Sequence, residues 1–91
     1  LQDLYKAFMC LKTEQECAAF LHDLCTPREI HEMAERWVIA RMLNRGGKSY
    51  RDISGETGAS TTTVGRVARY LQHEPWQGYR LVLGRWAADG K

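Results

Sequence analysis

The segment ETGASTTTVGR, from Glu56 to Arg66, decides how this sequence is interpreted. Its glycine, Gly58, is followed after one residue by a serine and three consecutive threonines, which are poor helix formers. Glycine adopts left-handed turn conformations at little steric cost, and serine is a favoured residue at the start of a helix. The segment therefore predicts a tight turn at Gly58 and a helix capped by Ser60.

Apolar residues predict a helix on each side of this turn. Ile53 points inward on the first helix, and the small Ser54 beside it permits two helices to cross closely. The second helix has an apolar face at helical spacing, made of Val64, Val67, Ala68 and Leu71. Two helices joined by a short glycine-containing turn form a helix-turn-helix, which we place at residues 49–73.

The opposite face of the second helix suits DNA. Thr61 and Thr62 present short side chains to phosphates and base edges, where longer ones would hold the helix away. Gly65 allows close backbone approach, and Arg66 and Arg69 add positive charge to this face. A helical hairpin that serves packing alone, with a solvated polar face, is the alternative interpretation.

Charge is distributed unevenly along the 91 residues, whose net charge is only +2. From Lys48 onward there are seven Lys and Arg residues, Arg80 among them, against four Asp and Glu residues, whereas most acidic residues lie in the first half. A polyanion is therefore expected to contact the second half, with Lys48 among the contacting residues.

The remainder of the sequence also predicts helices and no strand. Leu1 to Leu11 show helical spacing, and the capping boxes TEQE and TPRE begin two further helices at Thr13 and Thr26. The helix after TPRE is expected to end near Asn44, before two glycines, and its apolar residues surround most of its circumference. Because one small domain cannot cover them all, we expect a second subunit. A last helix at 79–88 completes an all-α, six-helix chain.

Other functional classes find little support. The three cysteines form no C-x-x-C pair and are interpreted as buried free thiols of a reducing cytosol. A metal site is the alternative interpretation, but the spacing of its candidate ligands fits no closed zinc pattern: Cys17, His22, Cys25 and His31. The segment RGGKS lacks the glycine spacing and the preceding strand of a phosphate-binding loop. We therefore expect no enzyme, metal or cofactor, and, with no apolar run long enough to span a membrane, a soluble cytoplasmic protein.

The segments LCTPREI, ARMLNRGGKSYRDISGETGASTTTVGRV and GYRLVL together resemble the Trp repressor superfamily, most closely its YerC/YecD-type bacterial branch. The resemblance covers nearly all of residues 1–86. It implies one all-α domain over 1–91, with dimerisation helices at 1–45, that forms an intertwined homodimer. It further implies a sequence-specific transcriptional regulator, a repressor in type, whose two helix-turn-helix units enter successive major grooves of double-stranded DNA.

The resemblance also implies roles for individual residues. Arg51 matches a phosphate-contacting arginine, and the reading helix, at 60–73, begins with residues 60–63. The candidate DNA-binding residues are therefore Lys48, Arg51, Ser60, Thr61, Thr62, Thr63, Gly65, Arg66 and Arg69. Positions around the corepressor tryptophan are matched by Thr26, Arg36, Thr63 and Arg66, and Val67 and Tyr70 complete the candidate effector pocket.

Two differences in this pocket argue against L-tryptophan as the effector. Val67 stands where the repressor has a glycine that leaves room for the ring, and Tyr70 replaces a small hydroxyl residue that helps hold the amino group. Filling a packed slot in this way costs about 1–3 kcal/mol. The pocket is therefore expected to be self-filled or shaped for another molecule. A dimeric protein-interaction module that presents Trp76 and Tyr79, without DNA binding, is the second functional hypothesis.

Overall fold

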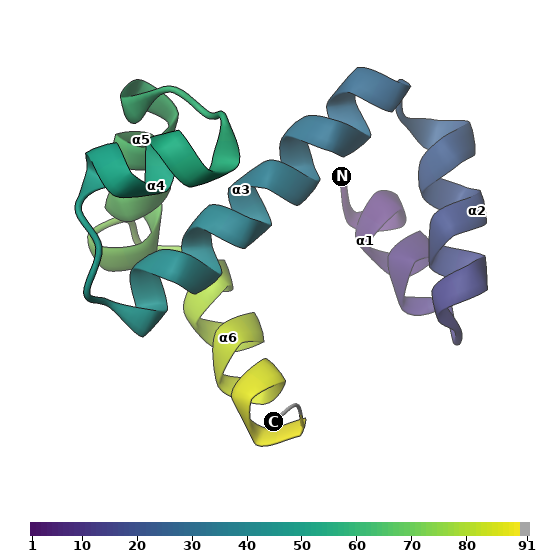
Figure 1. The fold of residues 1–91 in the computed structure, drawn as a ribbon. Coiled ribbons are helices and arrows are strands. Elements are labelled where there is room, and N and C mark those ends of the chain that lie inside the picture. Colours follow the sequence, from purple (N-terminus) through teal and green to yellow (C-terminus); the bar gives the residue numbers. More distant parts are fainter. Residues whose placement is uncertain (90–91) are drawn as a thin grey trace. The chain divides into compact units, whose positions relative to one another are not determined.

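The computed structural model describes residues 1–89, which form six helices and no strand (Figure 1). The all-α, six-helix prediction is confirmed, and helix boundaries lie close to the predicted ones. The helices are α1 (Gln2–Met9), α2 (Glu14–Leu24), α3 (Pro27–Arg45), α4 (Tyr50–Thr57), α5 (Thr61–Gln72) and α6 (Gly78–Asp89).

Internal contacts divide the chain into two units, Leu1–Glu32 and Met33–Lys91, the second described as far as residue 89. Helix α3 begins in the first unit and continues into the second. The first unit therefore contains α1, α2 and the start of α3, and the second contains the helix-turn-helix segment and α6.

Side-chain caps begin two helices of the first unit. The Thr13 hydroxyl accepts the backbone N–H of Glu16 at 3.1 Å, but the Glu16 carboxylate accepts the N–H of Lys12, not that of Thr13. The prediction of a complete capping box at TEQE is therefore wrong, because the carboxylate reaches one residue too far. The box at TPRE is complete, since Thr26 and Glu29 exchange both hydrogen bonds, at 2.8 and 3.1 Å.

None of the residues in α1 and α2 is buried. Phe8 and Phe20 meet edge to face, with ring centroids 5.3 Å apart, but Phe8 remains 39% exposed. Cys10 and Cys17 are exposed and Cys25 is only partly buried, so the single chain does not bury these thiols as expected. The physical reason is that these two short helices have apolar faces with too little covering them.

The core of the second unit lies between the second half of α3, α4 and α5. Its buried cluster contains Ile39 and Ala40 from α3, Ile53 from α4, and Val64 and Val67 from α5. Other apolar residues of α3, Met33 and Val38, are about two-fifths exposed, at 40% and 41%. The expectation that a second subunit covers this helix on further sides stays a prediction.

Candidate nucleic-acid interface

Three hydrogen bonds shape the turn between α4 and α5. Gly58 has φ +83°, the left-handed conformation predicted for it, and its N–H donates to the Ser54 carbonyl at 2.9 Å. The Ser54 hydroxyl donates to the carbonyl of Ala59, whose N–H donates to the Thr57 hydroxyl at 3.2 Å. These hydrogen bonds join the turn to the end of α4, which sets the direction in which α5 starts.

The hydroxyl residues at the start of α5 divide into two pairs. Ser60 caps the helix as predicted, because its hydroxyl accepts the N–H of Thr63 at 3.1 Å and lies 3.1 Å from the Thr63 hydroxyl. Thr61 and Thr62, by contrast, are exposed. Ser60 and Thr63 therefore stabilise the helix end, and Thr61 and Thr62 are available to a partner.

Gly65 lies on the partly exposed side of α5. A Cβ atom built there would meet only the Tyr50 ring, with its nearest atom, Cε2, at 3.9 Å, which is ordinary van der Waals contact. The packing of this chain therefore does not require a glycine at this position.

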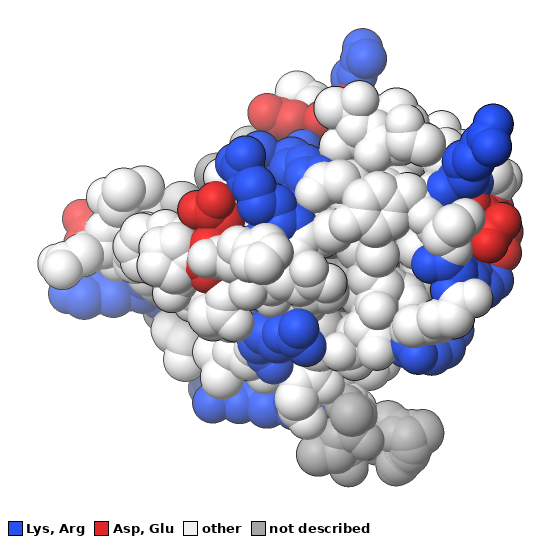
Figure 2. All heavy atoms as spheres, turned by 90° about the vertical axis from the view of Figure 1, so that its left-hand side faces the viewer, with Lys and Arg blue, Asp and Glu red and all other residues white. Residues whose placement is uncertain are grey.

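Two candidate DNA-binding cations are paired with carboxylates. Lys48 forms an ion pair with Glu56, and the Nε of Arg69 lies 3.1 Å from a carboxylate oxygen of Glu74. Figure 2 shows the side on which α4 and α5 lie in Figure 1, where Lys and Arg side chains predominate over Asp and Glu. The sequence analysis did not predict either ion pair, because spacings of eight and five residues match no recurring helical pair.

Arg80, counted with the basic residues of the second half, is exposed but forms hydrogen bonds to other helices of the second unit. Its Nε donates to the Leu71 carbonyl at 3.1 Å, and its Nη1 lies 3.4 Å from the Asn44 side-chain oxygen. The Arg80 guanidinium therefore connects α3, α5 and α6.

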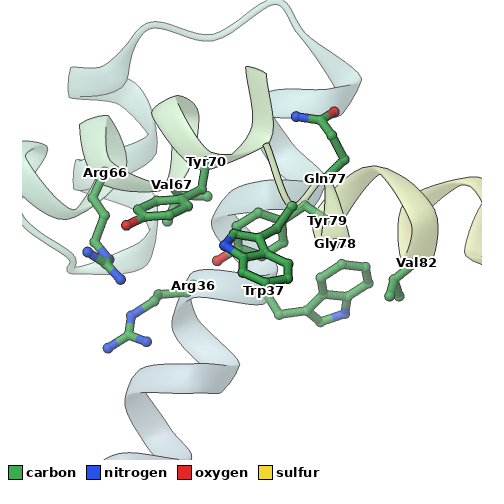
Figure 3. A pocket seen from close by; sticks show the side chains of 10 residues that line it. Arg36, Trp37, Arg66, Val67, Tyr70, Gln77, Gly78, Tyr79 and Val82 are labelled. Atoms are coloured by element: carbon green, nitrogen blue, oxygen red, sulfur yellow. The ribbon is translucent and has the colours of Figure 1, made fainter. Parts of the chain in front are cut away.

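A cavity of about 490 Å³ opens beside α5 in the second unit (Figure 3). It brings together four of the predicted effector residues, Arg36, Arg66, Val67 and Tyr70. Thr63 is not among its lining residues, and Thr26 lies in the first unit as a helix cap. Val67 is 1% exposed and lines this open cavity, and the expectation that the pocket is self-filled or shaped for another molecule stays a prediction.

The rest of the cavity wall includes three aromatic side chains and comes from segments that the sequence analysis did not assign to it: Trp37, Trp76, Gln77, Gly78, Tyr79 and Val82. Burial raises the pKa of Tyr79 above its ordinary 10.0, and the positive charges of Arg36 and Arg66 partly oppose that rise. The wall therefore combines aromatic faces with two guanidinium groups. Trp76 and Tyr79 were noticed only as candidates for protein interaction.

Metal and membrane sites find no support in the part of the chain described. No three His, Cys, Asp or Glu side chains within it lie together as metal ligands would. No helix among residues 1–89 is both long and apolar enough to cross a membrane.

Comparison with known proteins settles the family. Residues 1–86 match the family of the Trp repressor protein. The chain belongs to the Trp repressor family. This Trp repressor family member is 44% identical over 85 residues to the uncharacterised protein YerC of Bacillus subtilis (strain 168), a match that covers 93% of the chain and 80% of YerC.

Solved structures agree with the Trp repressor family assignment. The crystal structure of a TrpR-like protein from Eubacterium eligens ATCC 27750 is similar with a TM-score of 0.86 and 38% identity, covering 94% of this chain and 87% of that one. A candidate Trp repressor from Staphylococcus aureus has a TM-score of 0.85 and 37% identity, covering 94% and 84%. The resemblance inferred from sequence segments is confirmed.

Proposed function

We propose that this Trp repressor family protein is a sequence-specific DNA-binding transcriptional regulator, a repressor in type, and that it has no catalytic role. Helix α5 is the reading helix and enters the major groove. The observation that carries the proposal is the arrangement at its start, where a fixed turn leaves Thr61 and Thr62 exposed at the helix N-terminus. Helix N-termini favour anions such as DNA phosphates, and threonine can contact both phosphates and base edges.

The proposed roles separate positioning from specificity. Arg51, exposed in the first turn of α4, contacts phosphates, and Lys48 does so after it leaves Glu56. Thr61 and Thr62 contact base edges, while Ser60 and Thr63 hold the helix end in place. Arg66 and Arg69 add phosphate contacts further along α5, and Gly65 permits close approach. Phosphate contacts determine affinity, and base contacts determine sequence preference.

The functional unit that we propose is a homodimer. The isolated chain leaves large apolar residues exposed in α1 and α2, among them Tyr5 at 58%, Met9 at 83% and Leu24 at 49%. Helices of 8 and 11 residues are marginal without tertiary packing, so these faces need cover. A second copy supplies that cover and also provides a second reading helix.

The test begins with selection of bound sequences from random duplex DNA, followed by titration of a selected and a scrambled duplex. We expect Arg51→Ala to weaken binding to both duplexes alike and to reduce the salt dependence, because a phosphate contact carries no sequence information. Thr62→Ala is expected to reduce preference for the selected duplex and to leave binding to the scrambled one nearly intact. If both variants behave alike, the assignment of roles is wrong.

The cavity beside α5 is the proposed effector site, with Arg36 and Arg66 as its charged groups and a molecule other than L-tryptophan as its ligand. The second candidate function is a dimeric protein-interaction module, which one observation favours: Trp76 is 87% exposed at the edge of this cavity. Binding to bulk genomic DNA separates the two functions. Binding that weakens steeply with salt supports the regulator, and no binding at low salt supports the interaction module.

A further inference from the structure

Tyr70 lies where the cavity wall meets the basic face of α5. Its ring is close to two guanidinium groups of the same helix, with the central carbon of Arg66 4.7 Å and that of Arg69 5.3 Å from the ring centroid. The Tyr70 side chain is partly buried and forms part of the cavity wall (Figure 3). One aromatic side chain therefore contacts both arginines proposed to bind DNA along this helix.

The physical effect of such contacts is to restrict where an arginine side chain can go. A guanidinium within about 6 Å of a ring centroid is attracted to the electron-rich face of the ring. An unrestrained arginine loses much rotamer freedom when it binds a phosphate, and a side chain already held near its bound position loses less. The Nε of Arg69 also lies 3.1 Å from a carboxylate oxygen of Glu74, an anion that competes with a phosphate for this guanidinium.

We propose that Tyr70 is a positioning residue that holds the guanidinium groups of Arg66 and Arg69 ready for DNA phosphates. The inference rests on the proposed function, because it assigns to Tyr70 an effect on DNA affinity. It concerns the face of the ring and not the hydroxyl group, since both arginine contacts are made to the ring. A phenylalanine at this position should therefore preserve DNA affinity, whereas an aliphatic side chain should lower it.

The experiment compares the full chain with Tyr70→Phe and Tyr70→Leu in fluorescence-anisotropy titrations against a selected and a scrambled duplex. We expect Tyr70→Phe to match the wild type within about twofold, and Tyr70→Leu to bind both duplexes about two- to fivefold more weakly for each arginine released. Both duplexes should be affected alike, because the contacts are to phosphates. Equal affinity of all three proteins would overturn the inference.

A chain that lacks both arginines tests whether the effect of Tyr70 on DNA affinity depends on them. In an Arg66→Gln, Arg69→Gln chain, the further change Tyr70→Leu should have no additional effect on DNA affinity. An equal loss in that background would mean that Tyr70 acts through general packing, and the positioning role would be wrong. Absence of DNA binding by the wild type defeats the proposed function itself, and so is distinguished from failure of the variants alone.

A third substitution covers the case in which Tyr70→Leu does not fold. Replacing Tyr70 with pentafluorophenylalanine keeps an aromatic shape but withdraws electrons from the ring face, so that it no longer attracts a cation. The same two- to fivefold loss for each arginine is expected, with circular dichroism and thermal midpoint close to those of Tyr70→Phe. Unchanged affinity with this side chain would contradict the inference.

Discussion

The Nε of Arg80, in α6, donates a hydrogen bond at 3.1 Å to the carbonyl oxygen of Leu71, in the last turn of α5. The last four carbonyl groups of a helix have no partner within that helix. Arg80 satisfies one of them and also reaches the side chain of Asn44 near the end of α3. Helix α5 is therefore connected to α3 and α6 through one guanidinium.

We expect Arg80→Met to lower the free energy of unfolding by about 1 kcal/mol, because a hydrogen bond from a charged donor at a partly exposed site is lost. Urea denaturation measures this change. The salt dependence of DNA binding should stay as in the wild type, since Arg80 is not proposed to contact phosphates. Arg51→Ala is the matched control, and a reduced salt slope for Arg80→Met would contradict this assignment.

Ionisation of Tyr79 should make the free energy of unfolding vary with pH in the alkaline range. Burial raises the pKa of Tyr79 above 10.0 in the folded chain, so the unfolded chain loses the phenol proton first as the pH rises. The contribution of Tyr79 is therefore complete below pH 10 and decreases above it. We expect the stability difference between wild type and Tyr79→Phe to shift in favour of the variant above that pH.

The measurement is urea denaturation of both proteins at several pH values on either side of the ordinary tyrosine pKa. Tyr5→Phe serves as the control, because Tyr5 is 58% exposed in the first unit. A difference between wild type and Tyr79→Phe that stays constant over the whole pH series would show that burial of Tyr79 is not coupled to its ionisation.

Self-association should be measurable at micromolar concentration. We expect sedimentation velocity to show a dimer, and the thermal midpoint to rise with protein concentration, because association stabilises the folded state by mass action. Leu4→Asp, in α1, should weaken association, since it places a charge on a 37% exposed apolar residue that a second copy is proposed to cover. A stable monomer at every concentration would disprove the homodimer.

We expect that L-tryptophan does not bind saturably at one site per chain. Val67 and Tyr70 both line the cavity, and the resemblance implies a glycine and a small hydroxyl residue at these positions in the Trp repressor, so the larger side chains should narrow the space for the tryptophan ring. Isothermal titration calorimetry is expected to give no saturable heat with the wild type and to give heat with a Val67→Gly, Tyr70→Ser chain. Saturable binding to the wild type, accompanied by tighter DNA binding, would refute the prediction.

Local patterns explain how much of the fold could be predicted. The left-handed turn at Gly58 and the cap at Ser60 depend on residues within a few positions of one another, and the structure has both. The apolar face of α5 follows from helical periodicity, and its four members are buried as expected: Val64, Val67, Ala68 and Leu71. Where a local prediction was wrong, at Glu16, the difference was one residue in the reach of a flexible side chain.

The candidate interface required the tertiary structure. Lys48 pairs with Glu56, which is 8 positions away, and Arg80 bonds to Asn44, which is 36 positions away. No helical period predicts a contact at either sequence separation. The aromatic wall of the cavity likewise combines α3, α5 and α6.

The sequence by itself therefore determined the helices, their caps and the family, because these depend on near neighbours and on a continuous pattern of residue types. Only the tertiary structure decided which charged side chains pair with groups far away in the sequence, because that depends on how the helices cross.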